Sequence, residues 1–169
     1  MTSLPGSQVE KMKILEEKKI LVVDDEPDVL ETVIELFEPS QIVTAGSFEE
    51  ARKKIAEESF DLVILDIMGV NGFDLLKACR AAKLPAAMFT AHSLNSESLN
   101  AAVRLGAVSF LPKGELHRLP ELVAEILHEL EQGRTHWEKL FQRLGRFFKE
   151  RLDITWEDDP SKFPPNYYY

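Results

Sequence analysis

Five polar residues stand at the ends of hydrophobic segments in this 169-residue chain, and their types suit phosphoryl chemistry. They are Asp24 and Asp25 after "KILVV", Asp66 ending "DLVILD", Thr90 ending "AAMFT", and Lys113 after "VSFLP". Three carboxylates without a histidine or cysteine partner favour a hard cation, for which Mg²⁺ is the natural choice and Mn²⁺ a possible substitute. A carboxylate can also attack phosphorus to give an acyl phosphate. Lys113 could attract the incoming phosphoryl group, and the Thr90 hydroxyl could donate a hydrogen bond to it.

The elements that must position these residues alternate between apolar strands and amphipathic helices. The expected strands are residues 19–23, 41–45, 61–66, 86–90 and 108–111, and the expected helices are 27–38, 47–59, 72–82, 96–107 and 115–132. Such alternation predicts an α/β fold with a parallel sheet covered by helices on both faces. Since functional sites in such sheets form at the carboxyl ends of the strands, the five polar residues are expected to converge on one edge.

Composition excludes several classes of protein. The net charge of −9 argues against a general nucleic-acid partner, and 44% hydrophobic with 29% charged residues is typical of a soluble globular protein. Cys79 is the single cysteine, so no internal disulfide is possible. No apolar run approaches the roughly 18 residues of a membrane span, and the start lacks the apolar centre of a secretory signal. We therefore expect a cytoplasmic protein that does not associate with a membrane.

Four segments in order, "ILVVDDEPDVL", "FDLVILDI", "MFTA" and "FLPK", resemble the signatures of the CheY-like receiver domain of two-component response regulators. The resemblance covers roughly residues 18–131. It implies a flavodoxin-like (βα)5 three-layer sandwich with strand order 2-1-3-4-5. On this basis the chain divides into a flexible leader (1–16), a receiver domain (17–132) and a C-terminal amphipathic helix with an acidic aromatic tail (133–169).

The resemblance also implies roles for the acidic residues. Asp66 would be the phosphoacceptor. Asp25 would ligate Mg²⁺ directly, Asp24 would assist largely through water, and Met68 would lend its backbone carbonyl to the metal. The phosphoryl donor would be a phosphohistidine on a sensor histidine kinase or a phosphotransfer protein.

Three further residues would carry the response to phosphorylation. By the resemblance, Thr90 would bind the phosphoryl group and shift toward it, Phe110 would be the switch aromatic residue, and Lys113 would pair with the acceptor. The signal would leave through the fourth helix, fifth strand and fifth helix toward an output protein. The protein would then be a signalling component rather than an enzyme, with at most weak self-catalysed phosphorylation and dephosphorylation.

The sequence departs from the family pattern at two places. "DIMGVNG" reaches Gly72 two residues sooner than the family's loop does and lacks its proline, so the loop after Asp66 should be shorter. Lys113 is followed by Gly114 rather than proline, so a trans peptide bond is expected there. Pro112 precedes the lysine, which is tolerated if this strand lies at the edge of the sheet.

Other interpretations of the same residues remain open. Asp24 and Asp25 could form an ordinary acidic turn. By the resemblance, His92, two residues after Thr90, lies at a position that can tune dephosphorylation, but it could equally be an exposed loop histidine. The two departures from the family pattern allow a phosphorylation-independent interaction module that keeps only the fold. A small-molecule hydrolase is disfavoured because the set contains no general acid or base.

The segment 134–152 has aromatic and aliphatic residues at helical spacing and six basic against two acidic residues. A helix of this kind can pack on the receiver or on a second copy in a homodimer, with its charges solvated. It can also lie on a membrane or bind a partner protein.

Overall fold

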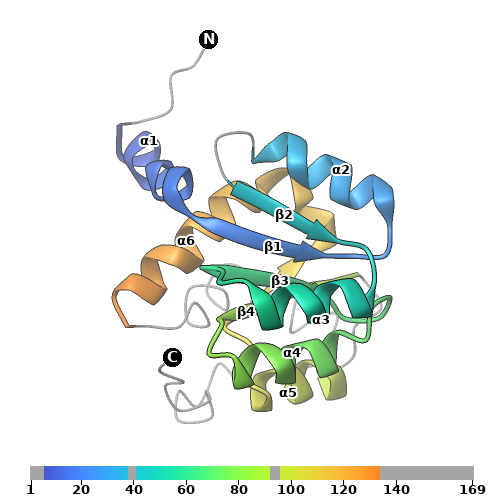
Figure 1. Cartoon of the computed structure of the whole chain (residues 1–169). Helices are drawn as coiled ribbons and strands as arrows, with labels where there is room; N and C mark the ends of the chain where they lie inside the picture. The colour runs from blue at the N-terminus through green and yellow to red at the C-terminus, as the bar shows by residue number, and fades with distance from the viewer. Residues whose placement is uncertain (1–5, 38–40, 92–95, 134–169) are drawn as a thin grey trace.

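The computed structural model describes residues 6–37, 41–91 and 96–133 (Figure 1). Five parallel strands form one sheet in the order β2-β1-β3-β4-β5. Their bounds are β1 Lys19–Val23, β2 Gln41–Ala45, β3 Leu62–Asp66, β4 Ala86–Thr90 and β5 Ser109–Pro112. The predicted order is therefore confirmed, and β5 is the edge strand that accommodates Pro112.

Helices cover both faces of the sheet, as predicted (Figure 1). They are α2 Pro27–Leu36, α3 Phe48–Glu57, α4 Gly72–Ala81, α5 Ser96–Arg104 and α6 Leu119–Glu131. Buried side chains form two clusters: one joins α3, α4 and α5 to the sheet, and the other joins α2 and α6 to it. Neighbouring residues of β1 divide between them, Leu21 and Val23 into the first and Ile20 and Val22 into the second. This division explains why the strand is apolar throughout.

Local signals in the sequence set several helix ends. The Ser47 hydroxyl accepts a hydrogen bond from the Glu50 backbone N–H at 3.2 Å, and the Glu50 carboxylate accepts one from the Gly46 N–H at 3.1 Å. The first bond satisfies an amide group that the first turn of α3 leaves unpaired, and the second ties the residue before the cap to that turn. Pro27 lies in the first turn of α2, and Gly106, with φ of 92°, follows α5.

The expected flexible leader is the main correction to the predicted organisation. Residues 1–5 lie outside the described part of the chain, but Gly6–Met12 form α1 and Lys13–Glu17 form a 3₁₀ helix, η1. Leu15 of η1 is 2% exposed and belongs to the core cluster shared with α6. The sequence does not predict this helix, because the segment is short and has too few apolar residues to show a helical periodicity. Packing against the rest of the domain stabilises it.

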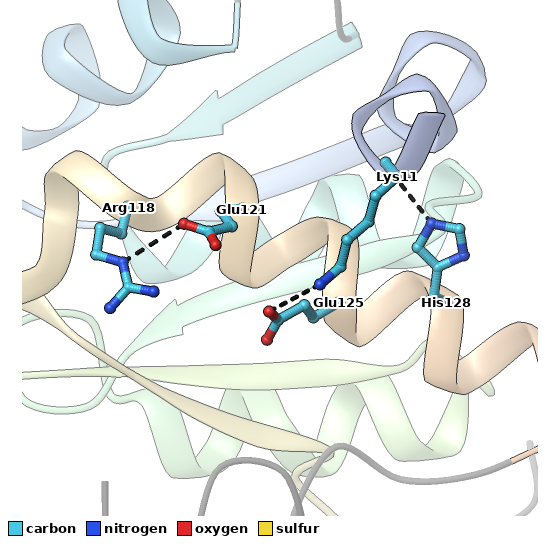
Figure 2. A network of polar contacts seen from close by, with 5 residues as sticks. All are labelled: Lys11, Arg118, Glu121, Glu125 and His128. Carbon is cyan, nitrogen blue, oxygen red and sulfur yellow. Dashed lines mark hydrogen bonds and ion pairs between the residues drawn. The ribbon is translucent and has the colours of Figure 1, made fainter. Parts of the chain in front are cut away.

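Polar contacts hold α1 against α6 (Figure 2). The Lys11 ammonium lies 2.9 Å from the Glu125 carboxylate, which is 1% exposed. The His128 ring nitrogen Nε2 lies 3.0 Å from the Lys11 backbone oxygen, and Lys18 pairs with Glu131 at 3.1 Å. The N-terminal segment is therefore part of the folded domain from residue 6 onward.

The predicted C-terminal helix and tail lie outside the described residues from position 134 onward, so both stay predictions. Within the described part, α6 ends at Glu131 and Gly133 follows with φ of 71°. Across residues 6–37, 41–91 and 96–133, no helix combines the length and apolar character needed to span a bilayer.

Candidate functional site

The carboxyl ends of β1, β3, β4 and β5 bring the predicted polar residues to one edge of the sheet. Asp24 follows β1, Asp66 ends β3, Thr90 ends β4 and Lys113 follows β5. The Lys113 ammonium lies 2.9 Å from Asp24 Oδ2, 3.3 Å from Asp66 Oδ1 and, more distantly, 3.8 Å from Glu26 Oε1. Residues from three remote segments thus meet in one charged cluster.

Burial sets the protonation behaviour of this cluster. Asp24 is fully buried, and Asp66 and Thr90 are each 6% exposed. Burial raises the pKa of Asp66 and the neighbouring Asp24 raises it further, against smaller opposing effects from Lys113 and the Gly69 N–H. Burial acts to lower the pKa of Lys113, but Asp24 and Asp66 together outweigh it and raise that pKa. Lys113 therefore stays charged between the two acids.

Three consecutive acids form a cluster of oxygen donors beside Lys113. Asp24, Asp25 and Glu26 each offer one carboxylate oxygen within 4.8 Å of the others. Asp24 Oδ1 accepts a hydrogen bond from the Glu26 N–H at 2.9 Å. Asp24 Oδ2 is enclosed and, among the described residues, meets no hydrogen-bond donor in regular geometry; the Lys113 ammonium faces it as an ion pair.

This donor set fits Mg²⁺ or Mn²⁺, which prefer carboxylate oxygens together with water. Asp25 and Glu26 are exposed, so both can reach an ion that arrives from solvent. The metal ligands expected from the sequence do not include Glu26, which the structure adds to the cluster. The signal was the third acid of "DDE", which lies on the same turn.

The other predicted site residues have defined places. Phe110 is fully buried on β5 in the core cluster with α3, α4 and α5. Met68 lies in the turn after β3 and is 81% exposed. The switch role of Phe110, the phosphoryl-binding role of Thr90 and the metal-binding role of the Met68 carbonyl stay predictions.

The shortened loop after Asp66 is a tight turn that uses special backbone positions. The Gly69 N–H donates to Asp66 Oδ2 at 3.2 Å, and the Gly72 N–H donates to the Ile67 carbonyl at 3.2 Å. Asn71 has φ of 52°, the left-handed region that asparagine tolerates. A Cβ on Gly72 would overlap the Asp66 carbonyl oxygen and lie 2.9 Å from Ile67 Cα. Glycine is therefore required where the turn enters α4.

The segment after β5 also follows the expectation from its sequence. The Lys113–Gly114 peptide bond is trans, as are the other peptide bonds of the described residues. Both residues lie in a second 3₁₀ helix, η2 Lys113–Arg118, which leads into α6. The ion pairs of Lys113 therefore form without a proline after it.

Comparisons with known proteins agree with this geometry. The family model for the response regulator receiver domain matches residues 20–126, more than half of the chain. Response regulator protein PilR of Pseudomonas aeruginosa is 37% identical over 117 residues, which cover 65% of this chain and 26% of PilR. Alkaline phosphatase synthesis transcriptional regulatory protein PhoP of Bacillus subtilis is 36% identical, over 57% of this chain and 42% of PhoP. This chain thus matches less than half the length of either relative.

Solved structures show the same likeness. The CheY-like receiver domain protein of Methanospirillum hungatei JF-1 superposes with a TM-score of 0.63 at 28% identity, over 68% of this chain and 97% of that one. The receiver domain of NtrX from Brucella abortus gives a TM-score of 0.57 at 32% identity, over 64% and 97%. Fold, sheet-edge acids, lysine and family match coincide, and the chain belongs to the response regulator receiver domain family of two-component systems.

Proposed function

We propose that this protein accepts a phosphoryl group on Asp66 and signals through protein–protein contacts in a two-component phosphorelay. The donor would be a phosphohistidine on a sensor histidine kinase or phosphotransfer protein. The observation that carries the proposal is the Lys113 ammonium between Asp24 and Asp66, with the carboxylates of Asp25 and Glu26 beside it. This arrangement offers a nucleophile, a fixed positive charge and oxygen donors for a divalent ion in one place.

The transfer exchanges one bond for another. A carboxylate oxygen of Asp66 attacks the phosphorus atom, so a P–O bond forms while the P–N bond to the donor imidazole breaks. The electron pair of the P–N bond stays on the donor nitrogen, which takes up a proton. Lys113 lowers the pKa of Asp66 against the larger raising effects of burial and Asp24, and it attracts the anionic donor group.

Mg²⁺, held by Asp25, Asp24, Asp66 and the Met68 carbonyl, would neutralise phosphoryl oxygens and so reduce repulsion between them and the acids. Glu26 is placed to join this set. The Thr90 hydroxyl, at the end of the neighbouring β4, would donate to a phosphoryl oxygen.

Phosphorylation adds a charge of about −1.5 to −2 at the end of β3. Thr90 and Phe110 would relay this change toward the surface formed by α5, β5 and α6, where an output protein or a second copy would bind. In this role the protein is a substrate and signal carrier, with at most weak self-catalysed phosphorylation and dephosphorylation.

A phosphorylation-independent interaction module is the second candidate. The shortened turn favours it, because Gly69 and Gly72 close that turn tightly around Asp66. Such a protein would keep the fold and its binding surfaces without accepting a phosphoryl group.

Acetyl phosphate separates the two candidates. The protein is incubated with Mg²⁺ and acetyl phosphate and then weighed by intact mass spectrometry, alongside Asp66→Asn and the control Asp28→Asn. Asp28 is an exposed carboxylate in the first turn of α2, outside the cluster. Gain of one phosphoryl mass by the native protein and Asp28→Asn, absent from Asp66→Asn and after EDTA, supports phosphorylation. No gain in the native protein supports the second candidate.

A further inference from the structure

Gly69 contacts both an expected metal ligand and the phosphoacceptor. Its backbone N–H donates to Asp66 Oδ2 at 3.2 Å. On the side where a Cβ would stand, the space is filled by the Asp25 carboxylate. A Cβ at this position would overlap Asp25 Oδ1 and Cγ and lie 2.6 Å from Oδ2, far inside van der Waals contact. One small residue therefore lies between two acids that come from different strands.

The overlap involves a side chain rather than the backbone. Asp25 is exposed, and its carboxylate is the free end of a short side chain that can rotate toward solvent. Gly69 is not among the glycines with left-handed φ in the described residues, which are Gly106 and Gly133. An alanine at 69 is therefore compatible with the backbone, and the steric conflict would be relieved by moving Asp25.

Gly72, three residues on, behaves differently and gives a useful contrast. Its hypothetical Cβ meets the backbone of Asp66 and Ile67, which cannot rotate away. The backbone of the turn requires glycine at position 72. At position 69, the absence of a side chain instead leaves space for the Asp25 carboxylate.

From these contacts we infer that Gly69 is a positioning residue for the divalent cation: its missing side chain lets the shortened turn hold Asp66 while the Asp25 carboxylate stays beside it. The inference rests on the proposed function, in which Asp25 and Asp66 share a Mg²⁺ ion. Any larger residue at 69 would displace Asp25 and so weaken cation binding, even with all the acids still present.

Direct binding of Mn²⁺ tests this, because free Mn²⁺ in solution has an EPR signal that is lost on binding. The full chain is titrated as native protein, Gly69→Ala, Asp25→Ala, the double variant, and the control Gly46→Ala. Gly46 is matched because it also follows a strand near the cluster, yet its Cβ would meet only the Asp24 backbone oxygen at 4.0 Å.

The expected result is a specific pattern among the five proteins. Gly46→Ala binds Mn²⁺ like the native protein, whereas Gly69→Ala binds roughly 10- to 100-fold more weakly, the usual effect of disturbing a group that positions a ligand. Asp25→Ala also binds more weakly, and adding Gly69→Ala to it causes no further loss, because both changes remove the same carboxylate from the site. Native affinity in Gly69→Ala, or a further loss in the double variant, overturns the inference.

Thermal unfolding keeps the test decisive if Gly69→Ala is unstable. Asp25→Ala removes the three atoms nearest to the new Cβ, so it should restore the melting temperature of Gly69→Ala; failure to restore it overturns the inference. If the native protein does not bind Mn²⁺, or binds it no more tightly than Asp25→Ala does, the metal part of the proposed function fails. This inference then fails with it. Binding that depends on Asp25 but not on Gly69 removes this inference alone.

Discussion

The Lys113 ammonium lies closer to Asp24 Oδ2, at 2.9 Å, than to Asp66 Oδ1, at 3.3 Å. Asp24 is fully buried, so Lys113 offsets a charge that would otherwise be costly. The pairing with Asp24 holds the ammonium within reach of Asp66. Asp24 thus contributes to the site by holding the Lys113 ammonium in place, in addition to any part that Asp24 has in metal binding.

Replacing Lys113 by methionine should destabilise the fold at neutral pH. Asp24 and Asp66 would then face each other without a cation, at a cost of about 1–3 kcal/mol for a site that is partly open to solvent. Lys77→Met is the control, since Lys77 pairs with a half-exposed Asp74 at 3.7 Å and should change stability by less than about 0.5 kcal/mol. Urea unfolding at pH 7 measures both, and equal stability of the two variants would contradict the structure.

Asp66→Asn should stabilise the protein at neutral pH. The pKa of Asp66 is raised in the folded state, so the folded protein binds its proton more tightly than the unfolded chain does. The stability gained from this tighter proton binding is fully present below the pKa of Asp66 in the unfolded chain. It is lost as the pH rises through the pKa of Asp66 in the folded protein. Asparagine does not ionise, so its advantage over aspartate should be present at pH 7 and small at pH 4. Melting temperatures at both pH values, with Asp28→Asn as control, check the sign; a variant that melts lower than the native protein at pH 7 would contradict it.

Gly72→Ala should destabilise the protein more than Gly69→Ala does. The new Cβ at 72 meets backbone atoms of Asp66 and Ile67, and overpacking of this kind costs about 1–3 kcal/mol. At position 69 the conflict is with a side chain that can turn into solvent. Denaturant unfolding of the two variants under one set of conditions gives the comparison. The reverse order would show that the backbone of the turn adapts more easily than Asp25 does.

Lys11→Met should destabilise the domain although it lies far from the acidic cluster. Its ammonium contacts the Glu125 carboxylate, which is 1% exposed, and loss of a charged partner for a buried acid costs about 1–3 kcal/mol. Lys18→Met is the matched control, because its partner Glu131 is half exposed and such pairs contribute about 0–1 kcal/mol. Urea unfolding at pH 7 distinguishes the two, and equal losses would mean that the Glu125 pair is no stronger than a surface pair.

The sequence was sufficient to predict the elements that place the site. The strands at 19–23, 41–45 and 86–90 have the predicted bounds, because buried parallel strands are short apolar runs with clear ends. The meeting of Asp24, Asp66 and Lys113 followed from their positions after strands of one sheet.

Other features depend on contacts that no local pattern records. Strand register and side-chain geometry decide whether Lys113 lies closer to Asp24 or to Asp66. The contact between Gly69 and Asp25 joins two turns that are distant in the sequence. The helix α1 depends on packing against α6, which follows it by more than a hundred residues, so its own few apolar residues give little indication of it.

The docking of α1 on α6 has a practical consequence for work on this molecule. The family match begins at residue 20, and a recombinant fragment cut there would lack Lys11, Leu15 and Lys18. Such a fragment would expose the apolar side chains that Leu15 covers, and Glu125 would lose its ion pair with Lys11. It would be prone to aggregate. Poor behaviour of a minimal fragment would then reflect a misplaced boundary rather than an unstable receiver, and expression vectors should keep the chain from residue 6 or earlier.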